Sequence, residues 1–95
     1  MTTKRFSKTP PLAHAGGMFL WFELPYATNK DVKRVLGSGL SGQDKVKYST
    51  RLYFVDTQTN RLYSLYKCYG VWRCGTMYDD HDETVKQAIE DWLTA

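Results

Sequence analysis

Apolar residues recur at every second position near the start of the chain, and this alternation predicts a β-strand over residues 17–26. The even and odd positions form two faces, Met18, Leu20, Phe22 and Leu24 against Phe19, Trp21 and Glu23. Pro25 removes a backbone donor and ends the strand. Because both faces are largely apolar, we expect this strand to lie in the middle of a sheet.

A short helix is expected after this strand. Thr28 and Asp31 stand three residues apart, close to the capping-box pattern of a helix start, although Asp replaces the usual Glu or Gln. The apolar stripe of this helix consists of Val32, Val35 and Leu36. Gly37 is a residue type that commonly follows the last turn, so we expect the helix to end there.

A second, longer helix is predicted within residues 79–95. Its apolar residues follow helical spacing along one side, at Val85, Ala88, Ile89, Trp92 and Leu93. Acidic residues precede them and complement the positive end of the helix dipole, namely Asp79, Asp80, Asp82 and Glu83. This helix must cover one face of a sheet, because its apolar side needs burial.

Three strands are predicted between the two helices, over residues 47–56, 61–68 and 71–78. Residues 56–60 form a polar turn between the first two, and Tyr69 with Gly70 forms the second turn. The resulting order is β-α-β-β-β-α. It predicts one small α+β domain over residues 17–95, with an antiparallel sheet and both helices packed on one face.

The strand register decides which residues stay uncovered, since a slip of one residue reverses every assignment. We pair Val55 with Arg61 and Lys67 with Trp72. The face that the helices cover then holds Leu52, Phe54, Leu62, Ser64, Tyr66, Cys68, Val71, Gly75 and Met77, with Arg73 as a misfit. The open face holds Arg51, Tyr53, Val55, Arg61, Tyr63, Leu65, Lys67, Trp72, Cys74, Thr76 and Tyr78.

Charge is divided unevenly along the chain, although the formal net charge is only +3. Residues 1–76 carry 12 Lys and Arg against 4 Asp and Glu, whereas residues 77–95 carry Lys86 against 6 acids. Residues 1–16 hold Lys4, Arg5 and Lys8 with two prolines, a composition that favours neither a helix nor a central strand. We interpret residues 1–16 as a flexible basic arm.

The open face predicted above mixes cations with large aromatic side chains and is the candidate partner-binding surface. Its proposed contact residues are Arg51, Tyr53, Arg61, Tyr63, Lys67, Trp72 and Tyr78. Tyr, Trp and Arg dominate protein–protein hot spots, and the same residue types stack bases and hold phosphates in nucleic-acid binders. A third hypothesis is structural, because aromatic residues simply favour strands. The acidic C-terminal segment repels a polyanion and therefore favours a protein partner.

Residues with catalytic or metal-binding chemistry are few and scattered. His14 lies in the arm and His81 in the acidic run, and neither stands beside a recognisable nucleophile motif. Cys68 and Cys74 fall on opposite faces in the register above and lack the spacing of a zinc site. We interpret the acids around His81 as a charged helix N-terminus and expect no metal there.

A Gly-rich match to G-x-G-x-x-G over residues 37–42 lacks the strand before it and the helix after it that a dinucleotide site requires. No cofactor is therefore expected. The sequence also has no export signal and no apolar run of membrane-spanning length, so we expect a cytoplasmic protein without a membrane partner.

Together these patterns predict a non-catalytic binding protein, either monomer or homodimer. Its expected role is that of a small inhibitor or accessory factor, of the type that phages and mobile elements encode. Its sheet face would bind a host protein or nucleoprotein complex. The alternative is a nucleic-acid-binding domain that uses the same basic and aromatic face. A cryptic enzyme that uses Cys74 or His81 is a further hypothesis.

Overall fold

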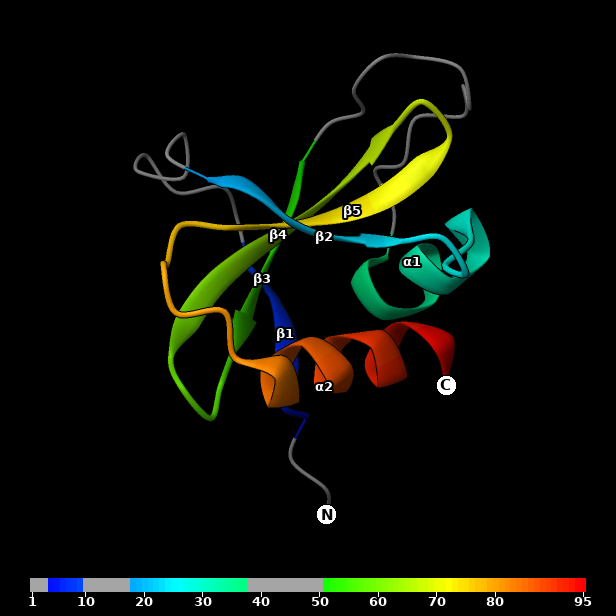
Figure 1. Ribbon diagram of the computed structural model, residues 1–95. Coiled ribbons are helices and arrows are strands. Elements are labelled where there is room, and N and C mark those ends of the chain that lie inside the picture. Colours follow the sequence, from blue (N-terminus) through cyan, green and yellow to red (C-terminus); the bar gives the residue numbers. More distant parts are fainter. Residues whose placement is uncertain (1–3, 10–17, 38–50) are drawn as a thin grey trace.

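A computed structural model describes residues 4–9, 18–37 and 51–95 (Figure 1). Within these ranges the chain forms five strands and two helices. In chain order these are β1 (Phe6–Thr9), β2 (Phe19–Leu24), α1 (Asn29–Leu36), β3 (Leu52–Asp56), β4 (Arg61–Cys68), β5 (Val71–Thr76) and α2 (Glu83–Thr94). The predicted α+β class, with an antiparallel sheet and helices packed against one of its faces, is confirmed.

The strands form a single sheet in the order β1-β3-β4-β5-β2, with every neighbouring pair antiparallel. The expectation that residues 17–26 form a central strand is wrong, because β2 lies at the edge beside β5. A register shift between Leu20 and Phe22 interrupts the alternation, so Phe19 and Phe22 share a face. Phe19 and Leu20 remain 44% and 41% exposed, which a central strand would not allow.

Part of the segment that we interpreted as a flexible arm is a strand. Phe6–Thr9 forms β1 and pairs with β3 at the opposite edge of the sheet from β2. The reason is Phe6, which is buried with its ring 5.7 Å from that of Phe54 and 5.0 Å from that of Trp92, measured between centroids. One anchoring aromatic side chain thus orders a stretch whose composition alone indicates an arm.

The register of the second hairpin is confirmed, and that of the first is wrong by one residue. Lys67 pairs with Trp72 as predicted, across a turn in which Tyr69 and Gly70 both have positive φ. Val55, however, pairs with Leu62 instead of Arg61. The error arises at Asp56, which resembles a turn residue in the sequence but belongs to β3 and is fully buried.

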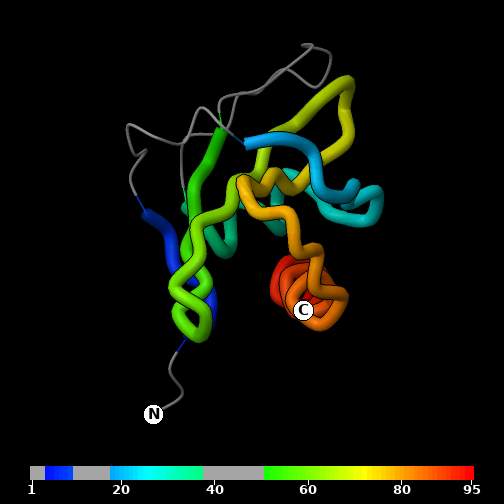
Figure 2. Tube along the Cα trace, turned by 60° about the vertical axis from the view of Figure 1, so that its left-hand side comes forward, coloured from blue at the N-terminus to red at the C-terminus, as the bar shows by residue number. Residues whose placement is uncertain are grey.

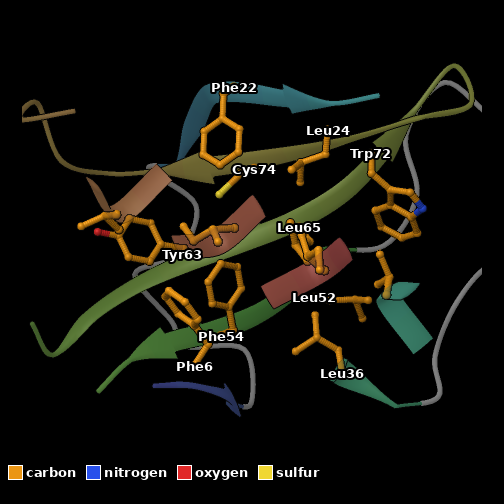
Figure 3. Packing of buried hydrophobic residues seen from close by; sticks show 14 residues of the cluster. Phe6, Phe22, Leu24, Leu36, Leu52, Phe54, Tyr63, Leu65, Trp72 and Cys74 are labelled. Carbon is orange, nitrogen blue, oxygen red and sulfur yellow. The ribbon is translucent and has the colours of Figure 1, made fainter. Parts of the chain in front are cut away.

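This one-residue difference changes which side chains of β4 lie on the same face of the sheet as the buried side chains of β3. Phe54 now shares a face with Tyr63, Leu65, Trp72 and Cys74, and all five side chains lie in the main core under the helices (Figure 3). Tyr63 and Trp72 are each 2% exposed. The prediction that Tyr53, Tyr63 and Trp72 face outward together is therefore wrong.

Both helices lie on the side of the sheet that carries these core residues, and Figure 2 shows α2 nearly end-on beside the strands. The predicted start and end of α1 are confirmed. Thr28 and Asp31 form a reciprocal capping box, and the N–H of Gly37 donates to the carbonyl of Lys33. Asp82 caps α2 by accepting from the N–H of Thr84.

The opposite face of the sheet carries a smaller apolar cluster, with Met18 and Leu62 at its centre. Arg51 lies across this face and donates to the hydroxyl of Ser64 at 3.0 Å. Gly75 permits this approach, because a Cβ there would lie 2.9 Å from the Arg51 Nη1 atom and 2.6 Å from Ser64 Oγ. The sheet is thus packed on both sides, most extensively beneath the helices.

Candidate partner-binding groove

The seven predicted contact residues do not form one surface. Tyr63 and Trp72 belong to the core, as described above. The side chains of Lys67 and Trp72 both donate to the Oδ1 atom of Asn29, at 2.9 and 3.0 Å, and so help to fasten α1 to the sheet. Asn29 could not have been assigned this role from the sequence, because the bonds join residues about forty positions apart.

The remaining predicted residues separate into two groups. Arg61 forms an ion pair with Asp80 at 2.6 Å, and its guanidinium lies 4.6 Å from the ring centroid of Tyr78. Arg51 and Tyr53 lie on the opposite face of the sheet, where the guanidinium of Arg51 stacks on the ring of Tyr66 at 4.3 Å. None of these contacts recreates the expected cationic and aromatic surface.

A different concave surface does combine cations with aromatic and aliphatic side chains. A groove with a volume of about 780 Å³ lies between β1, α1 and α2. The described residues that line it are Lys4, Arg5, Phe6, Ser7 and Lys8 at β1, Val35 and Arg34 on α1, and Ala88, Asp91 and Trp92 on α2. We call this surface the basic groove.

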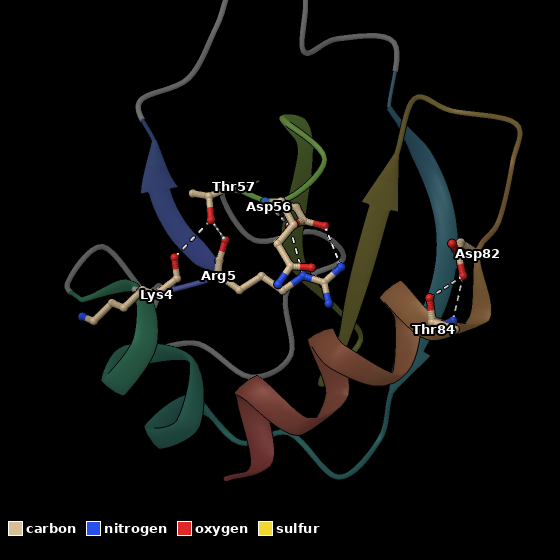
Figure 4. A network of polar contacts seen from close by, with 7 residues as sticks. Lys4, Arg5, Asp56, Thr57, Asp82 and Thr84 are labelled. Carbon is tan, nitrogen blue, oxygen red and sulfur yellow. Dashed lines mark hydrogen bonds and ion pairs between the residues drawn. The ribbon is translucent and has the colours of Figure 1, made fainter. Parts of the chain in front are cut away.

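An ion pair holds the β1 wall of the basic groove in place. The Nε and Nη2 atoms of Arg5 donate to the two carboxylate oxygens of Asp56, each at 3.1 Å (Figure 4). Thr57 adds bonds from its N–H and its hydroxyl to the carbonyl of Arg5, both at 2.7 Å. This bidentate geometry is the strong form of an Arg–carboxylate contact, so it fixes β1 against the end of β3.

The pKa of Asp56 is lowered. Burial alone raises it, but the hydrogen bonds from Arg5 and from the Gln58 N–H outweigh that effect. The same contact with Asp56 raises the pKa of Arg5. Both groups therefore remain charged at neutral pH, and the ion pair between Arg5 and Asp56 is kept. We call this ion pair the ionic clip.

A second cation fixes the helical side of the basic groove. Arg34, in the last turn of α1, donates from Nη2 to the carbonyl of Leu93 at 2.9 Å. Carbonyls in the last turn of a helix lack intrahelical partners, and a cation there also complements the helix dipole. Arg34 thus ties α1 to the end of α2 while its charge stays at the groove.

The electrostatic balance of the basic groove is strongly positive. Among the described lining residues, Lys4, Lys8 and Arg34 are cations without a carboxylate partner, whereas the charge of Arg5 is compensated by Asp56. The carboxylate of Asp91 also lines the groove and already accepts a bond from Gln87 at 2.9 Å. Lys4 and Lys8 are exposed, and within the described ranges no carboxylate forms an ion pair with either. Two lysines are therefore available to a ligand, whereas Arg5 and Arg34 hold the walls.

The apolar part of the groove comes from residues that also touch the core. Trp92 packs against Phe6 and Phe54, with both ring centroids 5.0 Å away. Val35 and Ala88 contribute small aliphatic surfaces beside it. A ligand would therefore meet the rings of Phe6 and Trp92 beside the cations of the groove, and aromatic side chains are enriched at protein-binding surfaces.

Thiol chemistry has little support in this fold. Cys68 and Cys74 are free and buried, and they point to opposite faces as predicted. Complete burial strongly raises the pKa of the Cys74 thiol, so the nucleophilic thiolate is scarce at neutral pH. His81 lies against the rings of Trp21 and Phe19, at 5.6 and 6.4 Å between centroids, and not beside either cysteine.

Among the described residues, no three His, Cys, Asp or Glu side chains are grouped so that they could hold a metal ion. Residues 38–42 of the Gly-rich match over residues 37–42 lie outside the described ranges, as do residues 1–3 and 10–16 of the predicted arm. No helix in the described part of the chain is long and apolar enough to cross a membrane.

Sequence reasoning found part of the groove and missed the rest. Lys4, Arg5 and Lys8 were recognised as a basic cluster, but their placement along a strand was not. Arg34 and Trp92 were missed as groove residues, although a cation in the last turn of a helix is a recognisable signal for a carbonyl partner. Nothing in the sequence indicates which side of Trp92 stays accessible.

Comparisons with protein-family models, with curated proteins and with solved structures give no match to this chain. The geometry and charge of the basic groove are therefore the evidence from which a function for this chain is inferred.

Proposed function

We propose that this chain is a non-catalytic protein-binding domain, which acts as a small inhibitor or accessory factor by docking its basic groove onto a protein partner. The observation that carries the proposal is the groove itself, a concavity of about 780 Å³ lined by Phe6 and Trp92 and by two exposed lysines that form no ion pair with a described carboxylate. Concave surfaces with an apolar floor and a few placed charges are the usual form of binding sites.

The composition of the walls favours a protein partner over a nucleic acid. One wall is α2, which belongs to the acidic segment of residues 77–95, and Asp91 of that helix lines the groove. A nucleic acid places a phosphate at every nucleotide and would bring several of them close to these carboxylates. A protein segment can instead position its charges selectively against Lys4 and Lys8.

The test uses immobilised protein in a lysate of the source organism, with two double variants of equal charge change. Lys4→Glu with Lys8→Glu reverses the free cations of the groove. Lys30→Glu with Lys33→Glu reverses two exposed cations of α1 that do not line it. We expect the wild type and the α1 variant to retain the same protein, and the groove variant to lose it.

Two outcomes would contradict the proposal. One is retention of the captured protein by the groove variant, which would place the contact elsewhere. The other is binding of labelled single-stranded or duplex DNA that falls steeply as salt rises, together with loss of the captured protein after nuclease treatment. This second outcome would support the nucleic-acid alternative, because a steep salt dependence is the signature of phosphate contacts.

A further inference from the structure

We propose that the occupant of the basic groove is an extended, acidic segment of the partner protein, which adds to the sheet as a sixth strand alongside β1. This inference rests on the proposed function and specifies the partner's chemistry. It follows from the free edge of β1, from the charges along that edge and from the space between β1 and the helices.

Among the described residues, the backbone of β1 has a free edge. β1 is the terminal strand of the described sheet, and β3 is the one described strand that pairs with it. The carbonyl of Arg5 accepts from the N–H of Thr57, and hydrogen bonding alternates along an antiparallel pair. Ser7 and Thr9 therefore bond toward β3, while the N–H and C=O groups of Phe6 and Lys8 point outward.

These outward groups are a template for another strand. In the described part of the chain, no turn, cap or side chain donates to or accepts from the backbone of Phe6 or Lys8. Residues 4–8 also line the groove consecutively, so the edge itself forms one of its walls. Peptides that add to a sheet edge gain affinity from such main-chain groups.

Charge complementarity selects the sign of the added strand. Lys4 and Lys8 lie at the two ends of the groove-lining stretch and form no ion pair with a described carboxylate. Arg34 adds positive potential from a fixed position, because its partner is the neutral carbonyl of Leu93, whereas the charge of Arg5 is compensated by Asp56. Among the described lining residues, an incoming acidic segment meets Lys4, Lys8 and Arg34 beside the carboxylate of Asp91, whereas a basic segment would be repelled.

The groove has room for a short strand. Four extended residues span about 13 Å and lie about 4.8 Å from their neighbour in a sheet. A volume of about 780 Å³ accommodates such a segment with side chains over Trp92 and Ala88. The Arg5–Asp56 clip holds the template strand rigid, which reduces the entropy lost on binding.

A second copy of this chain fits the groove less well than a separate partner. Six of its ten Asp and Glu residues lie before and along α2, and two of these are already engaged at the start of the helix. Asp80 pairs with Arg61, and Asp82 accepts bonds from Thr84 as the cap of α2. Presenting them as an extended strand would require that cap to open.

The first experiment measures fluorescence anisotropy with labelled octapeptides. The probe alternates Glu and Val, and its matched control alternates Lys and Val. We expect the acidic peptide to bind and the basic one to bind about tenfold more weakly or not at all. Equal binding of the two peptides, or no binding of the acidic one, would overturn the inference.

Backbone methylation of the same acidic peptide tests strand addition directly. One version carries N-methyl groups on every Glu amide and the other on every Val amide. Because an added strand bonds to β1 through alternate residues, one version should lose affinity by about tenfold and the other should retain it. Equal affinities of the two versions would show that charge alone drives binding and would overturn the strand.

Two variants of Lys8 test the same point on the protein side. Lys8→Ala and Lys8→Pro both remove the charge, but only proline removes the outward N–H. Proline is tolerated in edge strands at positions whose N–H faces away from the sheet. We expect Lys8→Pro to bind the acidic peptide about fivefold more weakly than Lys8→Ala, with similar urea midpoints for both variants.

Failure of this inference is distinguishable from failure of the proposed function. Equal peptide binding by the proline and alanine variants would contradict the proposed strand addition, but the groove could still be a protein-binding site. Loss of the captured protein from the Lys4 and Lys8 double variant would then still support the proposed function. Retention of that protein, with tight acidic-peptide binding, would instead separate the peptide site from the physiological contact.

Discussion

The two edge strands of the sheet have contrasting surroundings. β1 is short and is anchored by Phe6, which is 4% exposed, and Lys4, Lys8 and Arg34 line the groove at its free edge. β2 is longer, and it leaves Phe19 and Leu20 more than 40% exposed. A smaller concavity beside β2, of about 300 Å³, contains the carboxylates of Glu23, Glu90 and Asp91.

This contrast shows how one sheet can offer one edge strand for pairing with a partner and disfavour such pairing at its other edge strand. An unpaired strand edge attracts any extended chain, and proteins control that hazard with charge and bulges. β2 carries both a register shift and Glu23. At β1 the charges are positive and the edge faces a groove, so only a segment of suitable sign gains from pairing there.

The largest expected effect is loss of the β1 anchor. Phe6→Ala removes ring contacts to Phe54 and Trp92 and should lower the free energy of unfolding by about 3 kcal/mol in urea titrations. Phe19→Ala on β2 is the matched control and should cost less than about 1 kcal/mol, because that ring is half exposed. Equal losses would mean that the two edges are anchored alike.

Breaking the ionic clip should have the next largest effect. Arg5→Ala leaves the buried Asp56 with fewer donors and should lower the free energy of unfolding by about 2 kcal/mol. The comparison variant is Arg61→Ala, whose pair with Asp80 is exposed and should contribute much less. Similar losses in urea titrations for the two variants would contradict the structural role of Arg5.

The pH dependence of stability sharpens the same comparison. Asp56 has a lowered pKa in the folded state, so its contribution is complete above its unfolded pKa of about 3.9 and is lost as pH falls through the folded value. The stability difference between the wild type and Asp56→Asn should therefore shrink as pH decreases below about 4. Urea titrations at several pH values measure this stability difference. A difference that stays constant with pH would rule out a contribution of Asp56 ionisation to stability.

The smallest effect is expected at the α1 wall. Arg34→Gln removes the charged donor to the carbonyl of Leu93 and should lower the free energy of unfolding by about 0.5 kcal/mol. Binding of the acidic octapeptide should weaken at the same time, because one of the cations of the groove is gone. Unchanged peptide affinity would show that Arg34 serves only to join the helices.

The sequence was sufficient for features that depend on local chemistry. The Thr28 capping box, the Gly37 helix end and the one-sided stripe of α2 were all predicted and confirmed. The hairpin between β4 and β5 was also paired correctly, since Tyr69 and Gly70 sit together in a two-residue turn. These features need only neighbouring residues to form.

Features that depend on distant residues could not be predicted. Asp56 resembles a turn residue, and only Arg5, 51 positions away, explains why it ends a strand. The resulting slip of one residue moved Tyr63 from the expected open face into the core. β1 was not predicted for the same reason. Phe6 anchors this strand through its contact with Trp92, which is distant in the sequence.

The reactivity of the two buried thiols can report local opening of this fold. Cys74 lies beneath the helices and Cys68 on the far side of the sheet, and neither participates in a disulfide. An alkylating reagent can modify each of them only when its side of the sheet opens. Measuring the two modification rates by mass spectrometry would therefore distinguish opening of the helix-covered face of the sheet from opening of its other face.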